Sequence, residues 1–149
     1  MALHVPISLK SEHESLLARM RRAMREDDAT GEAARRVMQV MDGHMMREEK
    51  FALRPLGLLR ALGRGETPSE VAEAARLIEQ LREQMPQMID EHRQIAELLR
   101  EFARAAEAAG KAEYVTLAEE LIQHAHVEED VLYPAALLVG RVAGFVRAT

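Results

Sequence analysis

The segment His124-Ala-His-Val-Glu-Glu-Asp-Val-Leu-Tyr-Pro134 decides how this chain folds. It carries a histidine and, four residues later, a glutamate, Glu128. Residues four apart share one face of an α-helix, about one turn from each other. Leu121 and Val131 lie at helical spacing around this pair. The pattern therefore predicts a helix whose apolar stripe also carries an imidazole and a carboxylate, both directed into a protein core.

An earlier segment repeats this arrangement. His44 is followed four residues later by Glu48 and then by a proline, Pro55. A single histidine precedes each pair by a similar interval, His13 in the first half and His92 in the second. The chain is therefore interpreted as two copies of one helical hairpin.

The spacing of apolar residues predicts four helices. They are expected over residues 8–27, 32–54, about 67–109 and 112–132, with a short fifth helix in the apolar tail after residue 134. β-Branched and aromatic residues are sparse, which disfavours strands. The fold class is therefore expected to be all-α, in a single domain over residues 1–149 with its bundle at about 8–134 and its apolar tail at 135–149.

Several residues are expected to start or end these helices. Thr30-Gly31 is read as part of the turn before the second helix. Thr67 is the expected N-cap of the third helix, with Pro68 in its first position. Pro86 is expected to kink that helix and Gly110 to end it, while a further proline, at position 134, is expected to stop the fourth helix.

Composition excludes several functional classes. The chain has 149 residues, a formal net charge of −5 and no cysteine. The absence of cysteine excludes a disulfide scaffold, a zinc–thiolate site and a thiol nucleophile. Basic residues are interspersed with acidic ones, so no nucleic-acid partner is expected. No signal peptide or membrane-spanning run is visible, and a cytoplasmic location without a membrane partner is expected.

Four of the six histidines lie on the apolar stripe of their own predicted helix, and two glutamates share those stripes. Burying an unpaired carboxylate costs several kcal/mol, so two buried carboxylates facing four imidazoles imply a cation between them. Imidazole and carboxylate ligands suit iron, with zinc or manganese as alternatives. The predicted metal ligands are His13, His44, Glu48, His92, His124 and Glu128.

Other residues offer weaker alternatives. His126 and Asp130 form a rival pair at the same spacing, at the edge of the fourth stripe. His4 precedes the first helix and is read as an ordinary residue. The many methionines are interpreted as adaptable core residues, because most lie away from any pattern of thioether ligands.

The combined pattern of histidines and His-x-x-x-Glu pairs resembles the hemerythrin-like family, also called the HHE cation-binding domain. The segment 124–134 is particularly similar to the fourth-helix signature of that family, and the resemblance covers roughly residues 8–134. It implies an up-down-up-down four-helix bundle with a non-haem centre of two iron ions bridged by carboxylates. Members of the family carry, store or sense oxygen, respond to nitric oxide, or handle iron.

The sequence departs from the oxygen-carrying members in two ways. Those members have a fifth histidine on the third helix, but Met88 and Ala96 stand four residues on either side of His92. The metal there is expected to keep a water or to recruit a nearby carboxylate, Glu49, Glu91 or Glu129. Those members also place the last carboxylate five residues after the fourth-helix histidine, so Glu128 and Glu129 are both candidate ligands.

The resulting hypothesis is a di-iron protein that binds or senses oxygen, nitric oxide or peroxide, or that handles iron. The glutamates that adjoin the predicted ligands, at positions 12, 49, 91 and 129, are expected to orient the imidazoles. The alternatives are an iron-dependent, peroxidase-like enzyme and a metal-stabilised interaction or regulatory module. The apolar tail 135–149 is the candidate surface for a homodimer.

Overall fold

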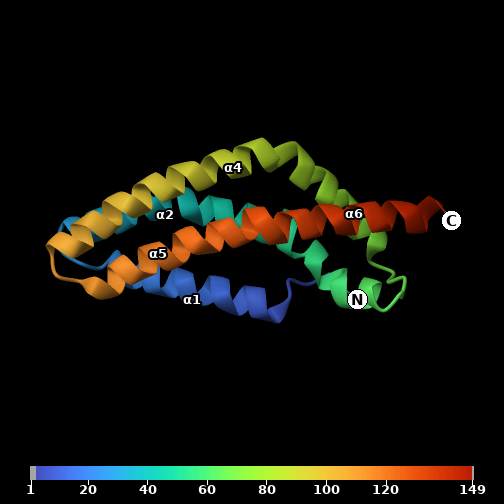
Figure 1. Cartoon of the computed structure of the whole chain (residues 1–149), viewed down its shortest axis with the longest axis horizontal. Coiled ribbons are helices and arrows are strands. Elements are labelled where there is room, and N and C mark those ends of the chain that lie inside the picture. The colour runs from blue at the N-terminus through green and yellow to red at the C-terminus, as the bar shows by residue number, and fades with distance from the viewer. Residues whose placement is uncertain (1–2, 149) are drawn as a thin grey trace.

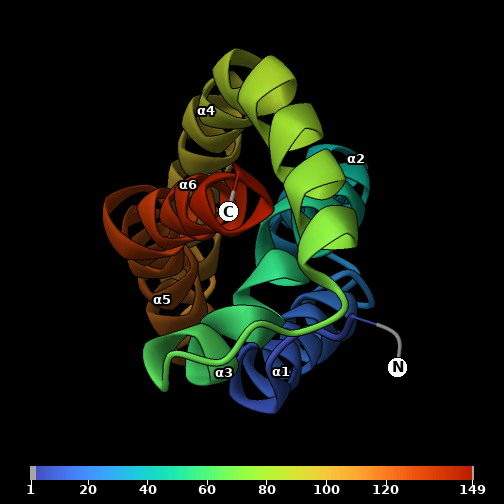
Figure 2. The same cartoon turned by 90° about the vertical axis from the view of Figure 1, so that its right-hand side faces the viewer.

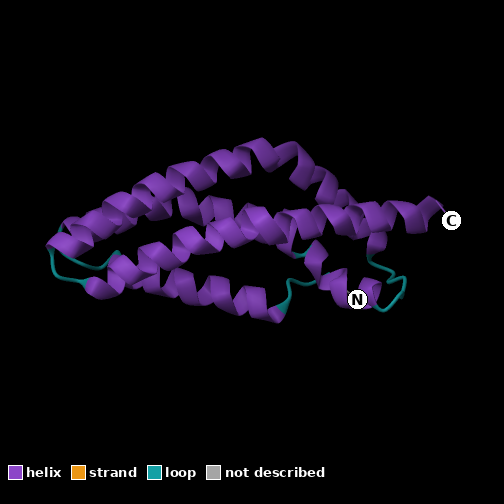
Figure 3. Ribbon diagram, viewed as in Figure 1, coloured by secondary structure: helices purple, strands orange, loops and turns teal. Residues whose placement is uncertain are grey.

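The computed structural model describes residues 3–148, and every regular element in this range is helical. Figure 3 shows helices joined by short loops. In chain order the elements are α1 (Ile7–Ala23), α2 (Ala29–Glu48), η1 (Glu49–Leu53), η2 (Pro55–Leu58), α3 (Leu59–Gly63), α4 (Val71–Ala108), α5 (Ala112–Val127), η3 (Glu128–Leu132) and α6 (Tyr133–Ala148).

Helices α1, α2, α4 and α5 form an up-down-up-down bundle (Figure 1). Each helix packs against the next in the chain, and α1 packs against α5, so the four close into a ring. The end-on view in Figure 2 shows α6 extending from α5 and lying beside the first part of α4. The fold is therefore the up-down-up-down four-helix bundle that the sequence predicts, extended at one end by α6.

The prediction that Pro134 stops the fourth helix is wrong. Helix α5 passes through η3, which is one π-helical turn, and continues as α6 with Pro134 in its first turn. The backbone N–H of Tyr133 donates to the carbonyl of Glu128, five residues earlier. Proline is tolerated in the first turn of a helical segment, because the N–H that it lacks is less needed there.

The first hairpin contains the same device. Helix α2 runs into η1, a π-helical turn in which Arg54 N–H donates to the carbonyl of Glu49. Pro55 follows directly and opens η2. Single π turns inside helices often lie at functional sites. The first π turn begins directly after Glu48, and the second begins at Glu128. Each π turn therefore lies at one of the two predicted glutamate ligands.

The connection between α1 and α2 also differs from the prediction. Thr30 and Gly31 belong to the first turn of α2, because the carboxylate of Asp28 accepts hydrogen bonds from both backbone N–H groups and so caps the helix. A Cβ atom on Gly31 would lie 1.9 Å from the carbonyl oxygen of Glu26, so only glycine fits this close approach. Helix α1 therefore ends early, at Ala23.

Helix α4 is continuous over 38 residues although it contains Pro86. Figure 1 shows that it bends in its yellow-green part, the part of the chain in which the kink is expected. The helix starts at Val71 instead of after Thr67, because Val71 N–H first closes a turn onto the carbonyl of Pro68. Gly110 follows the helix with a φ of +70°, as expected for a glycine that ends a helix.

Two apolar cores fill the structure, and the predicted ligands lie between them. One core contains Leu16, Met41, Ile95 and Leu121 together with their neighbours towards the α1–α2 and α4–α5 turns. The other contains residues of η1, η2, α6 and the first half of α4, among them Met88. Along each bundle helix the buried histidine lies at or next to the boundary between these cores. The fold therefore holds one buried polar layer between two apolar ones.

The tail forms a longer helix than expected. The inner face of α6 is buried against α4, while Leu138 and Phe145 are exposed. The homodimer through this tail remains a prediction. Within the described range, no helix is both long and apolar enough to cross a membrane.

Candidate metal centre

The bundle brings all six predicted ligands into the polar layer. α1 contributes His13, α2 contributes His44 and Glu48, α4 contributes His92, α5 contributes His124, and η3 begins with Glu128. All six side chains are buried. Four different helices and the π turn are therefore needed to assemble the cluster.

The six residues form two overlapping groups, each with four potential ligand atoms within 4.8 Å of one another. The outer half, as we name it, consists of His13 and His124 with the two glutamates. The inner half consists of His44 and His92 with the same two glutamates. Each half therefore has its own pair of imidazoles, and both share Glu48 and Glu128.

Each shared carboxylate turns one oxygen to each half. Oε1 of Glu48 lies 3.0 Å from Nε2 of His13, while its Oε2 lies 3.4 Å from Nε2 of His44. Oε2 of Glu128 lies 3.1 Å from Nε2 of His124, while its Oε1 lies 3.4 Å from Nε2 of His92. Two carboxylates in this arrangement could each bind a cation in either half.

Several atoms that face this centre lack a hydrogen-bond partner. They are His44 Nε2, Glu48 Oε1 and Glu128 Oε2, all fully buried. Buried polar atoms are nearly always hydrogen-bonded, so a cluster of exceptions needs an explanation. These nitrogen and oxygen atoms lie close to one another but are not aligned for hydrogen bonds, because each points towards the middle of its group of four ligand atoms. A cation at each point would satisfy them, so the residues present fit a pair of metal ions.

A second set of glutamates surrounds the imidazoles from outside. Nδ1 of His13, His44, His92 and His124 lies 3.3, 3.4, 2.8 and 2.9 Å from a carboxylate oxygen of Glu49, Glu91, Glu129 and Glu12, respectively. An ionised carboxylate can only accept a hydrogen bond, so each Nδ1–H is the donor. The proton on Nδ1 leaves the lone pair of Nε2 free to face the centre. The expected orientation of the imidazoles by these four glutamates is confirmed.

The partners follow a closed circuit around the bundle. Glu12 of α1 holds the imidazole of α5, Glu129 of η3 holds that of α4, Glu91 of α4 holds that of α2, and Glu49 of η1 holds that of α1. Each glutamate is adjacent in sequence to one ligand but binds the ligand of a neighbouring helix. Adjacent residues point about 100° apart around a helix, so one faces the centre and the other reaches sideways.

The charged side chains of the cluster shift one another's pKa values strongly. Burial by itself would lower the pKa of His13, but the nearby carboxylates of Glu128 and Glu48 outweigh it and raise the pKa to about 10. The pKa of His92 is raised to about 10 for the same reasons. Burial would raise the pKa of Glu48, but the neighbouring Glu128 and the surrounding imidazoles hold this pKa well below the usual range. The cluster therefore favours positive charge beside its carboxylates.

A comparison with protein families agrees with this geometry. The family model described as the Hemerythrin HHE cation binding domain matches residues 7–136. The chain belongs to this hemerythrin HHE family. Comparisons with curated proteins and with solved structures found no match. Membership supports cation binding, and the buried histidine–glutamate cluster is the part of this HHE chain that fits it.

The rival residues lie outside the cluster. His126 and Asp130 are exposed, and neither belongs to the two groups of potential ligand atoms. Glu129 lies on the outer side of the His92 ring, whereas the adjacent Glu128 lies between the two halves. His4 is exposed near the N-terminus, away from the HHE cluster.

Sequence reasoning missed one residue, Tyr133. Its buried hydroxyl donates a hydrogen bond to Glu48 Oε2 and lies 3.2 Å from Nε2 of His92. Burial and the nearby charges of Glu48 and Glu128 raise the pKa of this hydroxyl. In a regular α-helix, residues five apart point about 140° away from each other. The π turn brings Tyr133 back onto the face of Glu128, and the proline that follows was the available signal.

The glutamates expected to replace the missing fifth histidine are engaged elsewhere. Glu49, Glu91 and Glu129 all lie against Nδ1 atoms on the outside of the imidazole rings. Tyr133 is the side chain that approaches the inner half from within the cluster.

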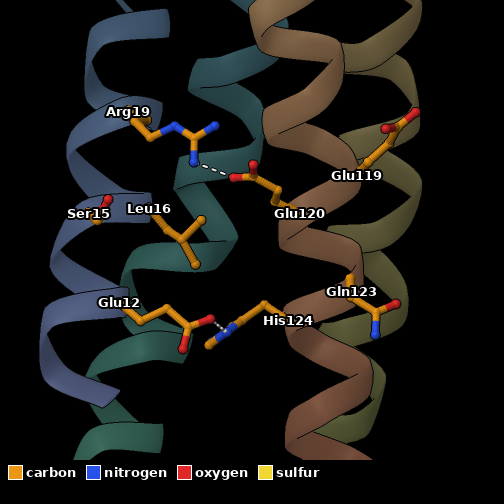
Figure 4. A pocket seen from close by; sticks show the side chains of 8 residues that line it. All are labelled: Glu12, Ser15, Leu16, Arg19, Glu119, Glu120, Gln123 and His124. Carbon is orange, nitrogen blue, oxygen red and sulfur yellow. Dashed lines mark hydrogen bonds and ion pairs between the residues drawn. The ribbon is translucent and has the colours of Figure 1, made fainter. Parts of the chain in front are cut away.

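A pocket opens next to the outer half. It has a volume of about 540 Å³ and lies between α1 and α5 (Figure 4). His124 and its partner Glu12 line it, and an ion pair between Arg19 and Glu120 lies farther along the same groove. The outer half therefore has a route to the surface.

Proposed function

We propose that this HHE protein holds two iron ions and binds a small ligand, namely oxygen, nitric oxide or peroxide, at that centre. The observation that carries the proposal is the division of both buried carboxylates between two pairs of imidazoles. A single cation would need only one of these pairs. The six predicted residues would be the ligands, with Glu48 and Glu128 as bridges.

The residues of the chain would bind and orient the metals. Each half offers four protein atoms, two imidazole nitrogens and two carboxylate oxygens. Four atoms leave positions of an octahedral ion free for an added ligand. The outer glutamates would keep the proton on each Nδ1 and so hold Nε2 as the donor atom. Bound ferrous ions would supply electrons and open coordination positions for the small ligand.

The surrounding apolar cores would restrict what reaches the centre. The apolar residues on either side of the polar layer are buried, and the pocket beside His124 supports entry from the α1–α5 groove. All six ligand side chains are at most 6% exposed, so a small molecule reaches the metals more easily than a large substrate does. This is why we favour diatomic ligands and peroxide over larger metabolites.

Metal analysis combined with spectroscopy tests the proposal. Protein purified with iron supplied should contain two iron ions per chain and absorb in the near ultraviolet. Nitric oxide added to the reduced protein should change the spectrum in proportion to iron content, and sustained peroxide turnover would favour the enzymatic alternative. A chain with one metal or none would contradict the dinuclear centre. Zinc as the native metal, without a response to these ligands, would favour the structural module.

A further inference from the structure

The hydroxyl of Tyr133 lies within the inner half of the centre. It donates to Glu48 Oε2 and lies 3.2 Å from His92 Nε2, two of the four atoms that would bind the inner metal. The tyrosine ring stacks on the His92 ring, with centroids 5.7 Å apart and an interplanar angle of 20°. The side chain is 1% exposed, so packing holds this hydroxyl in place.

We propose that Tyr133 is a further ligand of the metal held by His44 and His92, which it binds as a phenolate. The proposal rests on the dinuclear function proposed above. Ligand atoms about 2.1 Å from one metal and at right angles to each other lie about 3 Å apart. The hydroxyl oxygen is at this distance from His92 Nε2, so it can share a metal with that nitrogen without rearrangement.

The same contact shows where a cation would fit. His92 donates its Nδ1–H to Glu129, so its ring offers a lone pair at Nε2 whenever it is neutral, as a metal ligand must be. The phenol has one proton, which it donates to Glu48. Two lone pairs then face each other across 3.2 Å unless a cation lies between them. In the metal-free protein a proton on His92 can fill this role, and in the loaded protein a metal would replace it.

The exchange is balanced without any change of oxidation state. The metal–oxygen bond forms as the phenolic O–H bond breaks, and the proton leaves to solvent. The electron pair stays on the oxygen and becomes the donor pair to the metal. No oxidant or other reactant is needed.

Among residues 3–148, a tyrosine lies beside the inner half but not beside the outer half. In the first hairpin, Arg54 takes the place before the proline, and its side chain bonds to the Leu3 carbonyl and to Glu73. The outer metal would therefore keep only its four protein atoms. The small ligand should bind at this outer metal, beside the pocket lined by His124.

The composition of the chain makes the proposal easy to test. The protein contains two tyrosines and no tryptophan, so a tyrosinate signal in the near ultraviolet is not masked. Metal-free protein titrated with zinc should show one tyrosinate per chain, formed as the inner metal binds. The ferric protein should show a visible band, because electron density moves from phenolate to iron. Tyr133→Phe should abolish both signals.

Tyr114→Phe is the matched control. Tyr114 is also buried and hydrogen-bonded to a glutamate, but its partner is Glu26, near the α1–α2 turn. This variant should keep both signals. Two bound metals without a tyrosinate signal in the unmodified protein would overturn the role of Tyr133 and leave the dinuclear centre intact. Fewer than two bound metals would overturn both proposals. If Tyr133→Phe does not fold, resonance Raman spectra of the unmodified ferric protein decide, because phenolate ring modes must then be present.

Discussion

The outer and inner halves of the centre use the same two carboxylates but differ in their surroundings. Glu12, which holds the outer imidazole of His124, is 50% exposed and lines a pocket. Glu91, which holds the inner imidazole of His44, is only 12% exposed and also pairs with Arg47. The inner half also has the Tyr133 hydroxyl beside it. Each half has an imidazole beside a surface pocket, but the pocket at His124 is about 540 Å³ and the one at His92 about 300 Å³, so the outer half is the more open of the two.

This difference separates two tasks within one small cluster. Sharing the carboxylates places both halves in one electrostatic unit, so a charge added to one is felt by the other. The less open, inner half is suited to retaining a metal, because the Tyr133 hydroxyl and the Glu91–Arg47 ion pair lie beside its ligands. The more open, outer half is suited to exchanging a small ligand. Four predictions test how far the two halves act together and how far they differ.

The largest effect is expected from removing a shared carboxylate. Glu128→Gln should deplete both metals, because each oxygen of Glu128 serves a different half. Elemental analysis of protein purified with iron measures the loss. The adjacent Glu129→Gln is the comparison and should lose less metal, because Glu129 lies on the outside of the His92 ring and serves only the inner half. An equal loss in the two variants would contradict the assignment of Glu128 as the bridge.

Removing an imidazole from one half should have a smaller effect. His124→Ala should lower the metal content to about half, because the inner half keeps both of its histidines. His126→Ala should leave the content unchanged, because His126 is exposed two residues away. Metal content per folded chain is the measurement. If both variants lose metal equally, the rival pair of His126 and Asp130 is the better assignment.

The outer glutamates should differ between the halves. Loss of such a partner typically weakens metal binding about 10- to 100-fold. Glu12→Gln should lie near the lower end, because water can replace the exposed carboxylate. Glu91→Gln should lie near the upper end, because it also leaves the half-buried Arg47 without its ion-pair partner. Competition with a chelator of known affinity measures both. Equal affinities would mean that burial does not distinguish the two halves.

The smallest effect is on the stability of the metal-free protein. His13, in the outer half, and His92, in the inner half, have pKa values raised from 6.5 to about 10, so the folded state binds more protons than the unfolded state between these values. Their stabilisation is complete below pH 6.5 and is lost as the pH rises towards 10. The melting temperature of metal-free protein, followed by circular dichroism, should therefore fall over this range.

Metal reverses the sign of this pH dependence. Protons compete with cations for the imidazoles, so the stabilisation by metal should grow as the pH rises. His13→Gln should flatten part of the metal-free profile, because it removes one of the three histidines of the cluster whose pKa is raised. A metal-free melting temperature that is constant over this range would show that the cluster does not hold these protons.

Most of the fold and the identities of the six clustered residues could be predicted from the sequence. The helical period is local, so His44 and Glu48 share a face whatever surrounds them. The apolar residues around them determine that this face is buried. The same reasoning failed at Pro134, because the spacing of side chains does not reveal a π turn. The π turn adds one residue to the turn between Glu128 and Tyr133. Because of this extra residue, the helix continues through Pro134 and the Tyr133 side chain reaches the cluster.

The sequence by itself determined that the four histidines and Glu48 point inward, while only the tertiary structure decided which of these side chains meet. Glu128 and Glu129 are the same residue type in adjacent positions, so the sequence did not tell them apart. In the structure Glu128 lies between the two halves, whereas Glu129 lies on the outer side of the His92 ring. The glutamate that holds each imidazole comes from a neighbouring helix. The two oxygens of Glu48 likewise face histidines on two different helices. The physical reason is that a helix sets directions only around its own axis. The rotation and register of one helix against another depend on the packing of both apolar cores.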